Sequence, residues 1–182
     1  MNAALQQFSQ QLRALAGTAV NTRPLLCAGN PLTCTVALIG ANPATKTPFW
    51  SFWHDDSGMD RQAWIEAYLA IEGKFRRSRA AIERLLPQVK ARVIELNAFA
   101  AQSKRLHELE HSSRTNEVVT FVLNQIKPPV IVCAGKTALA AVQSLPLWWE
   151  PVLIEAPHFI YWGHEQTAQL AHRVNRSVKP PA

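Results

Sequence analysis

The sequence predicts an α/β fold, a three-layer α/β/α sandwich around a central, mostly parallel sheet of four strands. Four short apolar runs are typical of strands, and two of them are continuous and rich in β-branched residues, as in strands covered on both faces. Segments of helical periodicity lie between the runs, an alternation that is typical of parallel sheets. The 182 residues are expected to form one domain (1–182), with a core over about 30–175 and a loose tail over 177–182.

The four predicted strands lie at residues 35–39, 92–96, 130–134 and 152–155. Pro31 precedes the first strand, and Pro128-Pro129 precedes the third, as breaks in regular structure.

Six segments have the periodicity of helices: residues 3–16, 60–71, 78–86, 115–126, 137–145 and 165–174. In the first, Leu5, Phe8, Leu12 and Leu15 form one apolar stripe. Asp60 and Ser78 are expected to cap the second and third helices, and Pro87 to end the third.

The composition excludes several classes of protein. With 48% hydrophobic and 18% charged residues, the chain can bury a core, which argues against disorder and against a coiled coil. Its three cysteines are too scattered for a disulfide framework, a structural zinc site or an iron–sulfur cluster. His107 and His111 are four residues apart, but no third metal ligand is evident. We therefore expect no metal and no cofactor.

No secretory signal opens the chain, and no apolar run reaches the roughly 18 residues of a membrane span. The expectation is a cytoplasmic protein without membrane contact, associated with the nucleoid if its source is bacterial. We expect a monomer.

The formal charge of +6 is concentrated in one segment. Residues 74–105 hold nine basic and two acidic side chains, a net charge of +7, whereas the rest of the chain has ten basic and eleven acidic residues. A basic helix face in solvent and a phosphate-binding edge both fit this pattern.

The loops that follow the four strands are the expected place for a ligand, because ligands of such sheets bind outside the carboxyl ends of the strands. These loops are Gly40-Ala41-Asn42-Pro43-Ala44-Thr45, Asn97-Ala98-Phe99, Gly135-Lys136-Thr137 and Ala156-Pro157-His158-Phe159. The third is not a phosphate-binding P-loop, because Val130 stands where that motif needs glycine.

Two features have both a structural and a functional interpretation. Asn42 precedes a proline, so it either forms a simple turn or holds a ligand or water. The aromatic segment 48–54 either packs into the core or provides a ring that stacks on a flat base.

Taken together, the four loops resemble the uracil-DNA glycosylase superfamily, and especially the branch with Gly-x-Asn-Pro in its first motif, here Gly40-Ala41-Asn42-Pro43. Pro48-Phe49 is similar to the stacking phenylalanine of the family, and Leu96-Asn97-Ala98 to the strand whose asparagine reads the base. His158 falls where the family has His-Pro-Ser. The resemblance spans roughly residues 35–162.

The sequence departs from this family in three ways. Proline precedes His158 and phenylalanine follows it, Ala44 replaces a glycine found in many relatives, and the first motif has no aspartate. These departures favour an alternative function, a weak or inactive glycosylase-like module that binds a nucleobase, nucleotide or DNA. An enzyme acting on free nucleosides or another small molecule is a second alternative.

The resemblance implies a monofunctional DNA glycosylase that hydrolyses the N-glycosidic bond of uracil or a related damaged base flipped out of DNA. Asn42 would position water and His158 would stabilise the leaving base. The base would contact Ala41, Phe49 and Asn97, with Trp50 and Phe52 as other candidates for stacking. The expected DNA contacts are Lys74, Arg76, Arg77, Arg79, Lys104, Arg105, Lys136 and the wedge Phe159-Ile160, although Phe159 and Ile160 would equally fit burial under the last helix.

Overall fold

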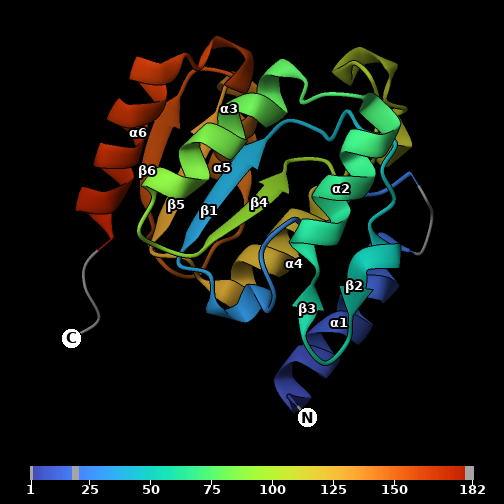
Figure 1. The fold of residues 1–182 in the computed structure, drawn as a ribbon. Coiled ribbons are helices and arrows are strands. Elements are labelled where there is room, and N and C mark those ends of the chain that lie inside the picture. Colours follow the sequence, from blue (N-terminus) through green and yellow to red (C-terminus); the bar gives the residue numbers. More distant parts are fainter. Residues whose placement is uncertain (1, 18–20, 179–182) are drawn as a thin grey trace.

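The computed structural model of the protein describes residues 2–17 and 21–178. Its centre is a parallel sheet of four strands in the order β4-β1-β5-β6 (Figure 1). The strands are β1 (Val36–Gly40), β4 (Val93–Asn97), β5 (Val130–Ala134) and β6 (Val152–Ala156). The predicted α/β/α sandwich with a four-stranded sheet is therefore confirmed, and every pairing within this sheet is parallel.

Helices cover both faces of the sheet (Figure 1). On one face, α3 (Arg77–Leu85) and α6 (His164–Ser177) pack against Val36 and Leu38 of β1. On the other face, α1 (Ala3–Ala16), α4 (Glu117–Ile126) and α5 (Lys136–Ser144) pack against Ala37 and Ile39. This division follows from the strand itself, because successive side chains of a strand point to opposite faces.

Most of the predicted elements begin and end within two residues of their observed limits. Helix α2 (Arg61–Glu72) begins at its predicted cap, where the side chain of Asp60 accepts a hydrogen bond from the backbone of Ala63 at 3.0 Å. Helix α6 continues to Ser177, which the sequence had assigned to the tail. Residues 179–182 of that tail lie outside the described residues.

The cap predicted for α3 needs correction. This helix begins one residue earlier, at Arg77, so that Ser78 lies inside its first turn and Arg76 occupies the N-cap position without a capping side chain. The sequence also gave no indication of a small antiparallel hairpin formed by β2 (Trp53–His54) and β3 (Gly58–Met59).

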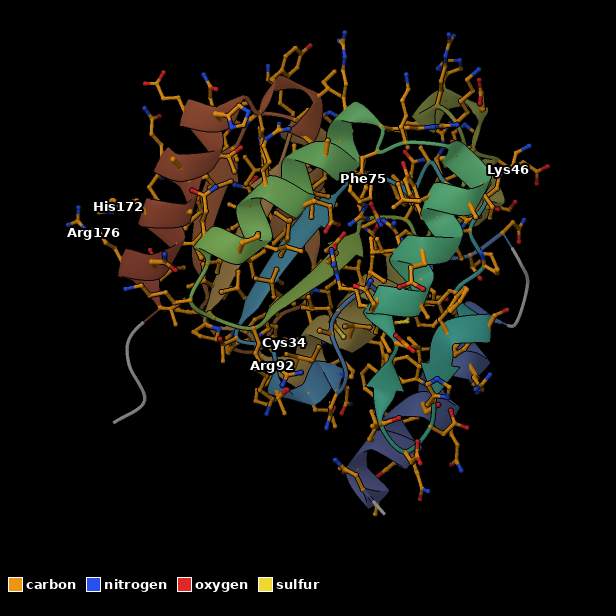
Figure 2. The ribbon with its side chains drawn as sticks, viewed as in Figure 1. Cys34, Lys46, Phe75, Arg92, His172 and Arg176 are labelled. Carbon is orange, nitrogen blue, oxygen red and sulfur yellow. The ribbon has the colours of Figure 1, made fainter. Side chains whose placement is uncertain are left out.

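The segment before the first strand covers an edge of the sheet. Backbone hydrogen bonds join Leu26 to Glu95 in both directions, at 2.9 and 2.8 Å, and Arg23 donates to the carbonyl of Ala100 at 2.9 Å. The outer edge of β4 is thereby paired rather than open. Cys34 and Arg92 lie just before the amino ends of β1 and β4, at the edge of the sheet opposite the carboxyl ends of the strands (Figure 2).

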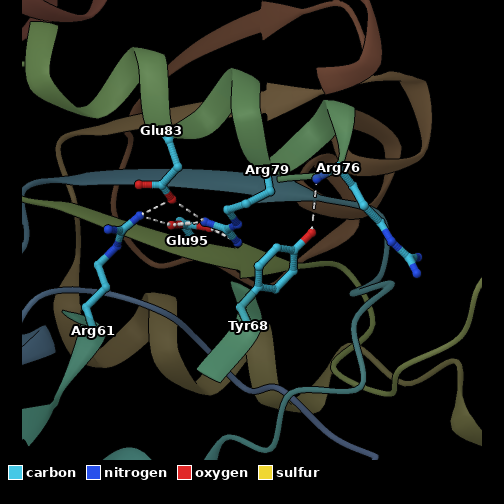
Figure 3. A network of polar contacts seen from close by, with 6 residues as sticks. All are labelled: Arg61, Tyr68, Arg76, Arg79, Glu83 and Glu95. Carbon is cyan, nitrogen blue, oxygen red and sulfur yellow. Dashed lines mark hydrogen bonds and ion pairs between the residues drawn. The ribbon is translucent and has the colours of Figure 1, made fainter. Parts of the chain in front are cut away.

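A buried ion pair links α3 to the centre of β4 (Figure 3). Glu95 occupies a strand position on the face covered by α3, where an apolar side chain would be usual, and Arg79 contacts both of its carboxylate oxygens at 2.8 Å. Both side chains are buried. Burial would raise the pKa of Glu95, but the charge and hydrogen bonds of Arg79, together with the charges of Arg61 and Arg23, hold this pKa below the ordinary value of 4.5.

Two further residues extend this pair into a network across three elements (Figure 3). Glu83 of α3 lies 3.1 Å from Arg79, and Arg61 of α2 lies 3.4 Å from Glu95 and also pairs with Glu83. Arg79 had been predicted to bind DNA phosphates. That prediction needs correction, because its guanidinium is buried and already bound by two carboxylates.

None of the described helices is long and apolar enough to cross a lipid bilayer.

Removing Arg79 should destabilise the fold more than removing its exposed neighbour Arg77. Arg79→Met leaves the carboxylate of Glu95 buried without its main partner, which should lower the free energy of unfolding by about 3–5 kcal/mol. Arg77→Met, on the same helix, should change it by less than about 0.5 kcal/mol. Urea denaturation of the two variants measures the difference, and equal midpoints would contradict the structural role given to Arg79.

Candidate functional site

A cleft of about 460 Å³ opens at the carboxyl ends of the strands. All four strands of the sheet lead into its lining, through Ala41 after β1, Asn97 at the end of β4, Thr137 in the first turn of α5 and His158 after β6. Strand β1 is flanked by β4 and β5, so the chain leaves it in one direction and later returns on its other side. Such a reversal of strand order separates the loops above the sheet and is the usual position of a ligand site in open α/β folds.

The cleft brings together most of the residues that the sequence selected. The predicted residues that line it are Ala41, Asn42, Arg76, Arg79, Asn97, Lys104, Arg105, His158, Phe159 and Ile160. Four others are outside its lining: Phe49, Lys74, Arg77 and Lys136. Of these, Lys136 lies on an adjoining pocket of about 630 Å³ that shares His158 with the cleft.

Asn97 is the last residue of β4, and only 6% of its surface is exposed. Its Nδ2 atom is buried and has no hydrogen-bond partner among the described residues. A buried donor without an acceptor costs about 1–3 kcal/mol. Asn97 lines the cleft, and an oxygen or a nitrogen lone pair of a bound ligand would satisfy this amide.

Gly40, beside Asn97 in the sheet, makes room for this arrangement. A Cβ atom at position 40 would lie 2.9 Å from the Oδ1 of Asn97 and 2.9 Å from the ring of Phe159. Both side chains therefore approach the backbone of β1 closely. Any larger residue at position 40 would push the amide and the ring out of place.

The amide of Asn42 is held by the neighbouring loop. Its Nδ2 donates to the backbone oxygen of Ser103 at 3.0 Å and to the hydroxyl of Ser103 at 2.9 Å. The backbone of Ser103 in turn donates to Pro43 at 3.0 Å. These bonds occupy the donor side of the Asn42 amide, so its Oδ1 is the atom suited to accept a hydrogen bond from water or a ligand.

His158 also lines the cleft and is half-buried. The backbone N–H of Ile160 donates to Nδ1 at 3.4 Å, an arrangement that favours the tautomer with the proton on Nε2. Burial lowers the pKa of His158 below its ordinary value of 6.5. The ring is therefore mainly neutral at pH 7 and presents Nε2–H as a donor.

The prediction that Phe49 stacks on a base needs correction. Only 1% of Phe49 is exposed, because its ring packs against Trp50 and Trp53 at centroid distances of 4.8 and 5.6 Å. Trp50 donates from Nε1 to the carbonyl of Gly17 at 2.8 Å, and Trp53 donates to the hydroxyl of Ser9 at 2.8 Å. The aromatic segment therefore fastens its loop to the first helix, and Phe49, Trp50 and Phe52 are all absent from the lining of the cleft.

The predicted wedge divides into a buried and an exposed part. Phe159 is buried against Trp162, at a centroid distance of 4.8 Å, and against Gly40, so it cannot insert into DNA as it stands. Its ring does line the cleft, together with Tyr68. Ile160 is 45% exposed and the next residue, Tyr161, is 69% exposed. Of the proposed wedge and the residue after it, Ile160 and Tyr161 are therefore the side chains that are exposed to contact DNA.

The cleft is basic. No Asp or Glu is among its described lining residues. Five arginine or lysine residues line it: Arg23, Arg76, Arg79, Lys104 and Arg105. Arg76 pairs with Glu72 outside the cleft, and Arg79 with Glu95. Lys104 and Arg105 are exposed.

Arg23 and Tyr68 were missed by the sequence analysis. The signal for Arg23 was a single charge directly before the apolar run Pro24-Leu25-Leu26-Cys27, whereas Tyr68 lies in the segment 60–71, which was predicted only as a helix. Tyr68 accepts a hydrogen bond from the backbone of Arg76 at 3.3 Å, which leaves its hydroxyl proton free to donate (Figure 3).

Comparison with known proteins does not identify the chain: it matches no protein-family model, and no curated protein matches it. No group of three or more His, Cys, Asp or Glu side chains that could hold a metal occurs in the part of the chain that the structure describes.

The imidazole of His158 should titrate below the ordinary value of 6.5. Because its folded-state pKa is lowered, the unfolded chain binds the proton more readily, so the residue should favour folding above pH 6.5 and lose this contribution as the pH falls through the folded pKa. NMR titration of the ring nitrogens measures the pKa and the tautomer. A proton found on Nδ1 at pH 7 would contradict the assigned hydrogen bond from Ile160.

Proposed function

We propose that the protein is a DNA base-excision glycosylase, which hydrolyses the bond between deoxyribose and uracil or a related damaged base. One observation carries the proposal: Asn42, Asn97 and His158, which lie at or just after the ends of three different strands, line a single cleft. Each of these side chains has one hydrogen-bonding atom without a partner among the described residues: Oδ1 of Asn42, Nδ2 of Asn97 and Nε2 of His158. They are three of the residues that carry the resemblance to the uracil-DNA glycosylase superfamily, whereas a fourth, Phe49, is buried outside the cleft.

The cleft is suited to a base that has left the duplex. Its volume of about 460 Å³ is within the usual range of small-ligand sites. In this proposal the amide of Asn97 pairs with the polar edge of the base, and the ring of Phe159, rather than that of Phe49, provides its aromatic contact. A site with a buried amide rejects bases that lack the matching group.

The chemistry requires help at both ends of the bond. As the bond breaks, negative charge develops on the leaving base, and the Nε2–H of His158 is the donor that stabilises it. The Oδ1 of Asn42 accepts a hydrogen bond from the attacking water and orients it toward the sugar carbon. Asparagine is a weak base, so turnover is expected to be slower than in an enzyme that has an aspartate at this position.

The surface around the cleft provides contacts for the DNA backbone. Lys104 and Arg105 are exposed on its rim, where phosphates on either side of a flipped nucleotide would lie. Ile160 and Tyr161 are the exposed apolar residues that could fill the gap left in the base stack.

A second candidate function is binding without cleavage. The observation that favours it is the absence of any Asp or Glu among the described residues that line the cleft, since a carboxylate is the usual general base for such a hydrolysis. A cleft of this kind would hold a base or nucleotide through Asn97 and His158 and release it unchanged.

Release of a base from DNA tests the proposed activity. Duplexes that contain one uracil, one hypoxanthine or one G·T mismatch should yield alkali-sensitive abasic sites with the wild-type protein. Asn42→Ala should lower the single-turnover rate at least ~100-fold while DNA affinity stays unchanged. Gln169→Ala, an exposed amide on α6, is the matched control. No base release from any duplex, with DNA binding intact, would favour the binding module instead.

The salt dependence of DNA binding tests the proposed phosphate contacts. Lys104→Ala with Arg105→Ala should weaken binding to all sequences and reduce the slope of log K against log salt by about 2, because each phosphate contact contributes about 0.9. The control is the double variant Lys90→Ala with Arg176→Ala, which removes the same charge from two exposed residues near the amino ends of the strands. The side chain of Arg176 extends away from α6 (Figure 2). Equal effects of the two double variants would contradict binding at the cleft.

A further inference from the structure

Arg23 is a buried cation without an ion-pair partner among the described residues. Only 8% of it is exposed, and its Nε atom is buried with no hydrogen-bond partner in that same part of the chain. Its guanidinium carbon lies 5.6 Å from the centre of the Trp64 ring. A ring face offers a guanidinium some attraction but no hydrogen-bond acceptor of the strength of a carboxylate.

The neighbouring carboxylates are already used. Glu95 and Glu83 are bound by Arg79 and Arg61, so the group of three guanidinium groups and two carboxylates, of which Arg61 and Glu83 are partly exposed, has one positive charge in excess. Burial, followed by repulsion from Arg79, lowers the pKa of Arg23 to about 10, and the attraction of the Glu95 charge offsets this lowering only in part. A charge removed from water in this way is costly unless an opposite charge reaches it.

Arg23 lines the same cleft as Asn97 and Tyr68. Asn97 has an unpartnered Nδ2, and the hydroxyl of Tyr68 has a proton to donate. The lining thus combines donors and an uncompensated cation with no carboxylate among its described residues. The ligand that complements such a surface is rich in acceptors and carries a negative charge.

We propose that the Arg23 side of the cleft is a subsite for an oxyanion that the ligand itself carries. A guanidinium presents paired N–H groups that match the two oxygens of a carboxylate or of a phosphate. The inference rests on the proposed function in one respect, that the ligand contains a nucleobase. The oxyanion is then either a carboxylate on the ring of a modified base or the phosphate monoester of a nucleotide.

Calorimetric titration with four probes distinguishes these two sources. The first pair is uracil and 5-carboxyuracil, and the second is deoxyuridine and deoxyuridine 5′-monophosphate. Wild-type protein should bind the charged member of one pair about 10- to 100-fold more tightly than the neutral member, as expected for hydrogen bonds to a charged group. Preference within the first pair identifies a carboxylated base, and preference within the second identifies a phosphate.

Arg23→Met is the variant that tests the residue, because methionine keeps much of the volume and removes the charge. It should abolish the preference for the charged probe and leave the affinity for the neutral probe within about threefold, whereas Arg77→Met, outside the cleft, should change neither. Equal affinity for the charged and neutral members of both pairs, or a preference that survives in Arg23→Met, overturns the proposal.

Thermal unfolding of the same variant supplies a second readout. Loss of an unpaired buried charge should leave the melting temperature of Arg23→Met unchanged or raise it, whereas a residue with a purely structural role would lower it. A lower melting temperature together with an unchanged probe preference would assign Arg23 to the fold alone. Neither measurement uses DNA or turnover, so failure of the glycosylase assay and failure of this proposal are separate results.

Discussion

The bidentate contact between Arg79 and Glu95 is the constraint on which the geometry of the cleft depends. It joins the first turn of α3 to the centre of β4, and Arg61 extends the connection to α2. Asn97 follows Glu95 by two residues on the same face of the strand. The ion pair therefore fixes the distance between the strand that carries the unpartnered amide and the helix that forms the rim above it. A buried pair of this kind contributes little net stability but makes other packings costly.

Two glycines allow side chains of the cleft to lie close to the backbone. Gly40 allows the amide of Asn97 and the ring of Phe159 to lie against β1, and Gly135, at a φ of 92°, turns the chain from β5 into α5 beside His158. Asn97 and His158 thus stand at or next to strand ends that are held by the sheet. Precise sites are more readily built on such rigid elements than on long loops. Because the groups that face the cleft are mainly donors, its chemistry selects ligands by their acceptors and their charge.

Local patterns predicted the elements of this fold, whereas long-range contacts decided the roles of individual side chains. Residues 130–134 and 3–16 had clear strand and helix periods, and both elements have those limits. The position of Asn97 at a strand end was also predictable. Arg79 could not be separated from its basic neighbours, because its partner Glu95 lies 16 residues away and on another element. Phe49 was ambiguous for a similar reason, since its burial depends on Trp53, which is held by Ser9 of α1.

The hydrogen bonds between Asn42 and Ser103 also have a kinetic consequence. They tie the loop after β1 to the loop after β4, and the backbone bond from Ser103 to Pro43 reinforces the tie. Any motion that separates these two loops must therefore break the hydrogen bonds that orient the Asn42 oxygen, and it can proceed only as fast as these bonds break. The mobility of the two loops is thus coupled to the alignment of the group proposed to hold the water.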